Sequence, residues 1–163
     1  MVKLINRPLL EELSRKAAAA PRRRANHNLH PTLNDAVQRL CIAAEPGTYF
    51  RPSRHAMPDT WEVLIAIRGA LVLLLFEDDG TVRERFVLAP SGDVIGIEIP
   101  PHTWHTLASL EPGSVFLEVK EGPYHPTEEK DFAAWAPPEG HAETGRFESW
   151  YRSARKGAIP PRW

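Results

Sequence analysis

The stretch GTYFRPSRH at residues 47–55, followed by Glu62, decides the fold predicted for this chain. A second stretch, PPHTWH at residues 100–105, ends in another histidine. Imidazole and carboxylate groups are ligands that divalent transition metals prefer. In a small barrel the strands that carry such groups are neighbours, so the side chains can meet in the lumen. The two stretches therefore predict a mononuclear metal site formed by His55, Glu62 and His105.

Short strand-like runs separated by turn residues surround both stretches. Asp79-Gly80 is typical of a hairpin turn, and Pro46-Gly47 ends the first run sharply. By its period this first run fits a helix or a buried strand, and we favour a strand. Many short strands with Gly/Pro turns are typical of a sandwich or a barrel. The expected strands cover residues 37–43, 48–55, 61–67, 70–76, 81–88, 94–99, 104–110 and 114–119.

The two ends of the chain have a different character. Residues 4–20 are predicted to form a short amphipathic helix, and residues 143–155 a second short helix. The sequence between the first helix and the first strand is polar and loop-like. We expect one domain with three parts: a helix and polar arm at 1–36, a barrel at 37–120, and a wrapping segment with a helix at 121–163.

Composition excludes several classes of function. The chain has 163 residues, a formal net charge of −1 and a single cysteine, Cys41. This charge balance gives no global field for nucleic acid or an anionic membrane, and the arginines at 22–24 are too few for a nucleic-acid footprint. No run approaches the roughly 20 apolar residues that span a bilayer. Cys41 is expected to be a small buried side chain, and a single cysteine suits a reducing cytoplasm because no intrachain disulfide can form.

Two residues bear on a fourth ligand position. Residues two apart on a strand face the same side, so Ser53 shares a face with His55. Its hydroxyl is a poor ligand, but it could hold a water in that position. His102 lies three residues before His105 and could replace the missing ligand, or its ring could point to solvent.

A further group of residues is expected to contact a ligand at the mouth of the barrel. Arginines supply charge-assisted hydrogen bonds to a carboxylate or phosphate, and aromatic side chains wall a pocket. The alternative is that the arginines are solvated and that the aromatics fill the core. The predicted substrate-binding residues are Arg51, Arg68, Tyr49, Trp104, His30 and Tyr124.

The chain resembles the cupins. Their first signature, a glycine, five residues, His-x-His, a glutamate, six residues and a glycine, is matched by Gly47, His55, Glu62 and Gly69, with Ser53 at the first histidine. More specifically, the chain is similar to the WbuC-type cupin-fold metalloproteins. The matching runs include NHNLHP (26–31), EPGTY (45–49), WHT (104–106), LEVKEGPY (117–124) and KDFAAWAP (130–137).

The resemblance implies a mainly β, cupin-type antiparallel barrel, which is a jelly-roll-like double-stranded β-helix with short N- and C-terminal helices. It also implies one divalent transition metal, Fe, Mn, Ni or Zn, in the lumen. We expect a metal-dependent enzyme that acts on a small polar substrate, either sugar-like or a carboxylate. The alternative is a non-catalytic small-molecule or sugar-binding cupin with a degraded metal site. A cytoplasmic homodimer is expected, with neither nucleic acid nor membrane as a partner.

Overall fold

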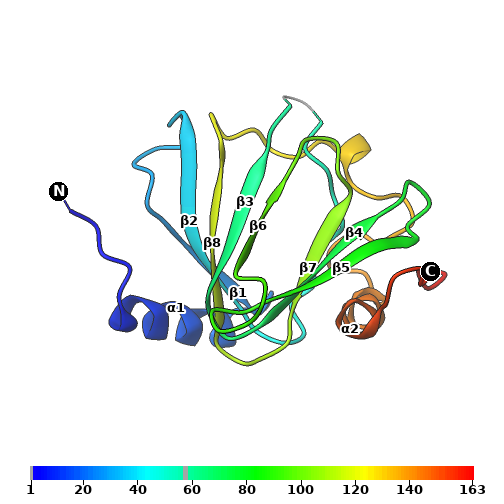
Figure 1. Ribbon diagram of the computed structural model, residues 1–163, viewed down its shortest axis with the longest axis horizontal. Coiled ribbons are helices and arrows are strands. Elements are labelled where there is room, and N and C mark those ends of the chain that lie inside the picture. Colours follow the sequence, from blue (N-terminus) through cyan, green and yellow to red (C-terminus); the bar gives the residue numbers. More distant parts are fainter. Residues whose placement is uncertain (1, 57–58) are drawn as a thin grey trace.

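The computed structural model describes residues 2–56 and 59–163 (Figure 1). Within them the chain is mainly β, with one helix near each end, as the sequence predicts. Neither helix combines the length and apolar character needed to cross a membrane. In chain order the elements are α1 (Arg7–Ala19), β1 (Arg24–Asn28), β2 (Val37–Ala44), β3 (Glu62–Arg68), β4 (Leu71–Phe76), β5 (Val82–Leu88), β6 (Gly96–Ile99), β7 (His105–Ser109), β8 (Ser114–Glu121), the 3-10 turn η1 (Glu129–Asp131) and α2 (Thr144–Ser153).

The strands form two antiparallel sheets that face each other. One sheet has the order β1-β2-β8-β3-β6, and the other has the order β5-β4-β7. The ladders between the named strands end at β1 and β6 in the first sheet and at β5 and β7 in the second. The expected antiparallel fold is therefore confirmed, but the sheets are not closed into a hydrogen-bonded barrel. The space between them is filled by side chains and, toward one end, by cavities.

Three apolar layers hold the molecule together. The middle layer lies between the sheets and contains Leu64, Leu73 and Phe116. Helix α1 covers the outer face of the first sheet with Leu10, Leu13 and Ala17, which pack on Cys41, Ala43 and Val115. Cys41 is a fully buried thiol, as expected, and burial raises its pKa. Helix α2 covers the outer face of the second sheet, so the two helices lie at opposite ends of the molecule (Figure 1).

Two local predictions are corrected by the structure. Residues 48–55 do not form a regular strand, although Ser53 makes isolated bridges to His105 and Phe132. Pro52 lacks an N–H and fixes φ, so a continuous ladder cannot run through this segment. The polar arm contains a strand, β1, which pairs with β2 along the edge of the first sheet. The sequence did not indicate this strand, because an edge strand that is open to solvent shows little alternation of apolar and polar residues.

Gly69 joins β3 to β4, and both its backbone conformation and the close packing around it require a glycine. Its φ is +71°, and a Cβ at this position would lie 2.9 Å from the Cα of Ser114 and still closer to the Ser114 Oγ. We therefore expect Gly69→Ala to lower the free energy of unfolding by about 2 kcal/mol or more. Urea denaturation measures this loss. Gly145→Ala is the control, because no atom lies within 4 Å of a Cβ there; equal stability of the two variants would contradict the argument.

Candidate metal centre

Three predicted ligands from distant parts of the chain converge between the sheets. His55 precedes β3, Glu62 begins β3, and His105 begins β7. Each offers one ligand atom, and these atoms all lie within 4.8 Å of one another. The Nε2 atom of His105 lies 2.5 Å from Glu62 Oε1, and the Nε2 atom of His55 lies 3.5 Å from Glu62 Oε2. Glu62 and His105 are buried, whereas His55 is partly open.

The orientation of His105 is fixed by its other ring nitrogen. Its Nδ1 lies 2.8 Å from the carbonyl oxygen of Thr103. A carbonyl only accepts hydrogen bonds, so Nδ1 carries the hydrogen, and in the neutral ring the Nε2 lone pair faces Glu62. A backbone carbonyl that holds Nδ1–H in this way is a common support for a metal-bound imidazole.

The buried charges at the centre depend on one another. Burial is the largest single influence on Glu62 and opposes its ionised form, but the interactions with His105 and His55 together outweigh burial and hold the pKa of the carboxyl well below its usual range. Burial likewise opposes the charged form of His105, yet Glu62, the Thr103 carbonyl and Glu118 together outweigh it and raise the pKa of the imidazole. The site therefore favours a positive charge between ring and carboxylate.

The donor set at this centre fits a metal ion. One ligand atom each from His55, Glu62 and His105 lies within 4.8 Å of the others, and Glu62 Oε1 has no polar partner besides His105 among the described residues. Two imidazoles and one carboxylate are the ligand set of non-haem Fe(II) sites and also suit Mn, Ni and Zn. His55, Glu62 and His105 are thus the residues that would hold the ion.

The segment that carries His55 is held on both sides. Ser53 exchanges two backbone hydrogen bonds with His105, of 3.1 and 3.0 Å, and Ala133 N–H donates to the Pro52 carbonyl at 2.9 Å. Directly opposed residues of an antiparallel pair share a face, so Ser53 lies on the same side as His105. Both residues line one cavity of about 210 Å³. Ser53 therefore lies beside His105 at the lining of this cavity.

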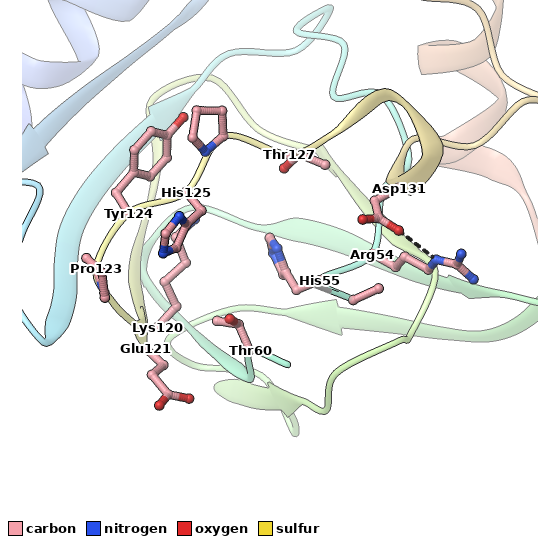
Figure 2. A pocket seen from close by; sticks show the side chains of 12 residues that line it. Arg54, His55, Thr60, Lys120, Glu121, Pro123, Tyr124, His125, Thr127 and Asp131 are labelled. Atoms are coloured by element: carbon pink, nitrogen blue, oxygen red, sulfur yellow. Dashed lines mark hydrogen bonds and ion pairs between the residues drawn. The ribbon is translucent and has the colours of Figure 1, made fainter. Parts of the chain in front are cut away.

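A smaller recess opens beside His55. Figure 2 shows the His55 ring between the Arg54–Asp131 ion pair on one side and Lys120 and Tyr124 on the other. Arg54 also stacks on the ring of Trp104, 4.5 Å from its centroid. Arg54, the residue before His55, is therefore held between the buried Asp131 carboxylate and the Trp104 indole. These contacts fix the backbone that carries the His55 imidazole.

Of the predicted substrate-binding residues, Arg51 lines the 210 Å³ cavity. It forms an ion pair with Glu129 at 2.9 Å, and its guanidinium lies over the Phe132 ring. Its buried Nε has no hydrogen-bond partner among the described residues. His30 and Tyr124 line a second, adjoining chamber of about 590 Å³.

The structure does not bring the other four predicted residues to the cluster. His102 is exposed with φ +64°, and its Nε2 lies 2.8 Å from Asp59 Oδ1. Arg68 instead ties β3 to the Gly113 carbonyl at 2.8 Å and to α1 through Leu10. Tyr49 is buried against Tyr151 in the outer core. The Trp104 indole N–H donates to Asp78 at 3.1 Å, which directs it to the β4–β5 turn.

Sequence reasoning missed the most central polar pair of the cavities. Glu118 and Lys120 form a 2.8 Å ion pair on β8, and both residues line the 210 Å³ cavity and its larger neighbour. Burial opposes the charge of Lys120, but Glu118 outweighs it and raises the pKa of the amine. The signal was present in the alternation of β8, where Phe116, Glu118 and Lys120 share the inward face.

Solved structures with the cupin fold are similar to this chain. An oxalate oxidase in complex with glycolate, a substrate analogue, aligns with a TM-score of 0.50 at 16% identity, over 66% of this chain and 55% of that one. KdgF from Halomonas sp. aligns with a TM-score of 0.48 at 22% identity, over 63% and 80%. A cupin 2 domain-containing protein from Halorhodospira halophila gives 0.47 at 22%, over 66% and 72%. These similarities show a shared fold.

No curated protein sequence matches the chain. One family model does, and it carries the description "Domain of unknown function (DUF6016)". It matches residues 5–88, which include α1, the strands β1 to β5 and two of the three candidate ligands, His55 and Glu62. Since this match spans half of the sequence, the chain belongs to the DUF6016 family.

Proposed function

We propose that the protein is a metal-dependent enzyme whose one divalent ion is held by His55, Glu62 and His105. The observation that carries this proposal is the convergence of one ligand atom from each of these three side chains to within 4.8 Å of one another, beside a cavity. A divalent metal in this position polarises a ligand oxygen or lowers the pKa of a bound water. Three protein ligands would leave coordination positions for a substrate.

The surrounding side chains select the substrate. Arg51 has an unpartnered buried Nε–H beside the cavity, and the Lys120 ammonium group, which is paired with Glu118, adds N–H donors to the same lining. Both groups suit oxygen atoms of a carboxylate or a sugar-like molecule beside the metal. Glu62 supplies the negative charge that a divalent ion needs in a buried position. The proposed substrate is therefore a small polar molecule that binds through its oxygens.

A non-catalytic ligand-binding protein is the second candidate, and Ser53 favours it. Ser53 lies on the face of His105 where a further imidazole would complete a four-ligand site. With a hydroxyl there, the metal is held by fewer strong ligands and the protein would serve to capture a ligand. Turnover separates the two functions, because a binding protein retains its ligand unchanged.

Ser53→His is expected to tighten metal binding by at least about tenfold. A directly bound imidazole should contribute no less than outer-shell partners, whose loss costs about 10–100-fold in affinity. Competition with a chelator measures the change. Ser91→His, on an exposed turn, is the control. Equal affinity of Ser53→His and the parent protein would show that residue 53 does not reach the metal.

The resemblance to WbuC-type cupins supports the metal and a sugar-related substrate. We further propose a cytoplasmic homodimer, since the open edges of the sheets at β1 and β5 need cover. Sedimentation that shows only an 18.3 kDa species at micromolar concentration would contradict the dimer.

The proposed function is tested by metal analysis followed by a turnover screen. The purified protein is titrated with Fe, Mn, Ni and Zn, and the loaded protein is then assayed on activated sugars and small carboxylic acids. We expect one equivalent of metal and a turnover that is lost in His105→Ala. Metal uptake without any turnover supports the binding protein, and no uptake of any of the four metals refutes the metal-dependent enzyme.

A further inference from the structure

The concave face of the five-stranded sheet forms one continuous surface that runs from the metal centre to β1. Register places Glu62 opposite Lys120, and Lys120 opposite Gln38 on β2. In the next row, Leu40 lies opposite Glu118 on one side and Asn28 on the other. Paired residues share a face of the sheet, so these side chains all lie on its concave face.

The adjoining chamber of about 590 Å³ lies over the β1–β2 end of this face. It shares Phe50, Glu118 and Lys120 with the 210 Å³ cavity, so the two spaces meet at these residues. Neighbouring strands are about 4.8 Å apart, and β3 is three strand spacings from β1, so the surface extends about 14 Å beyond the metal ligands. A ligand that fills both spaces is much longer than a single sugar ring.

Each cation that lines this chamber already has a carboxylate partner. Arg24 contacts Glu139 at 2.5 Å, donates to the Tyr49 carbonyl and covers the ring of Phe50. Arg22 shares the same Glu139, and Lys120 pairs with Glu118. None of these three cations is unpaired, so the chamber suits a neutral part of a ligand.

Neutral hydrogen-bonding groups remain for recognition. The Asn26 amide donates to Asn28 Oδ1 at 2.9 Å, which leaves the Asn28 amide hydrogens and Asn26 Oδ1 without a partner in the described chain. Leu40 and Ile42 provide an apolar floor between the amides and Glu118. Paired amide groups over an aliphatic floor suit a molecule with several hydroxyl groups and C–H faces.

His30 adds a buried ring nitrogen to the lining of the chamber. Its Nδ1 lies 3.0 Å from both the N–H and the carbonyl oxygen of Arg39. The Arg39 backbone therefore engages Nδ1 in either neutral tautomer, and Nε2 is the ring nitrogen that remains for a ligand. This Nε2 is buried with no partner among the described residues. A ligand hydroxyl group, which can donate or accept, would supply the missing partner.

We propose that this chamber is a second subsite, which binds a neutral polyhydroxylated ring while the first unit of the same ligand binds at the metal. The ligand is thus a carbohydrate of disaccharide length, with His30 Nε2 hydrogen-bonded to a hydroxyl group of its distal ring. The assignment rests on the proposed function for the position of the first unit. The subsite itself is built from β1, β2 and β8, and it can be tested without the metal.

The probes are gluconate and lactobionate, which share an aldonate head and differ by one galactose ring. Calorimetry on the metal-loaded protein is expected to show lactobionate binding about tenfold or more tightly than gluconate, the effect of one or two added hydrogen bonds. Equal affinities, or no binding of lactobionate, would overturn the subsite.

Two substitutions at His30 separate the ligand contact from the fold. Asn at position 30 places an amide atom near the position of Nδ1, so it preserves a contact with the Arg39 backbone and removes the distal nitrogen. Gln at position 30 places an amide near Nε2. We expect His30→Asn to abolish the preference for lactobionate, His30→Gln to retain part of it, and gluconate affinity to stay unchanged in both. His27→Asn, on the solvent-exposed part of β1, is the control and should retain the full preference.

A titration of metal-free, ¹⁵N-histidine-labelled protein with lactose distinguishes failure of the metal site from failure of the subsite. Lactose is expected to shift the ring nitrogen signals of His30 and to leave those of His27 in place. This shift supports the subsite even if no metal binds. Unshifted His30 signals, or a lactobionate preference that persists in His30→Asn, would overturn it.

Discussion

Glu62→Gln lowers the affinity of the protein for a divalent metal by at least about a hundredfold, because it replaces the one anionic ligand by a neutral amide. Glutamine keeps the shape of the side chain at a position that is 4% exposed. The loss of charge also removes the electrostatic partner of His105, so the pKa of that imidazole should fall. Isothermal titration with Zn or Mn measures the affinity, and NMR titration of His105 measures the pKa.

Glu98→Gln is the matched control for this experiment. Glu98 lies on β6, next to β3, but its side chain is exposed and its register partner is Val63 rather than a candidate ligand. We expect this variant to bind metal as the parent protein does. If Glu62→Gln and Glu98→Gln bind equally well, Glu62 is not a ligand.

Phe76→Ala lowers the free energy of unfolding by about 3–5 kcal/mol, the range for a large aromatic removed from a packed core. Phe76 is 1% exposed on β4, and its ring centroid lies 4.8 Å from that of Trp135 and 6.1 Å from that of Trp150. It therefore joins the second sheet to α2 and to the segment that follows η1. Denaturation in urea, monitored by tryptophan fluorescence, provides the measurement.

Val87→Thr is the control for the core substitution. Val87 lies on the neighbouring strand β5 and is 38% exposed, and threonine keeps its branched shape. Its stability should stay within about 0.5 kcal/mol of the parent protein. A loss below about 1 kcal/mol for Phe76→Ala would show that the outer aromatic layer is not a packed core.

The cluster of candidate ligands could be predicted from sequence because local rules govern its placement. The turn residues fixed the starts of β3 and β7, and the period of two in a strand fixed the faces of Glu62 and His105. Gly69 was predictable for the same reason, since a tight β3–β4 connection requires a positive φ.

The walls of the cavities were harder to predict because they depend on which strands become neighbours. Lys120 lies beside Glu62 only because β8 pairs with β3, and this pairing joins segments that are far apart in sequence. Arg68 was expected at a ligand, yet it faces α1, which a motif on one strand does not reveal. Tyr49 was drawn into the outer core by Tyr151 of α2, another long-range contact. The alternation of residues within each strand could be read from the sequence, whereas the side chains that pack against each face could not.

Anomalous diffraction from crystals grown with one equivalent of zinc tests the central claim most directly. We predict a single zinc peak between the sheets, about 2.0–2.2 Å from the Nε2 atoms of His55 and His105 and from a carboxylate oxygen of Glu62. A zinc peak elsewhere, or no peak at these three residues in crystals that contain bound zinc, would contradict the account.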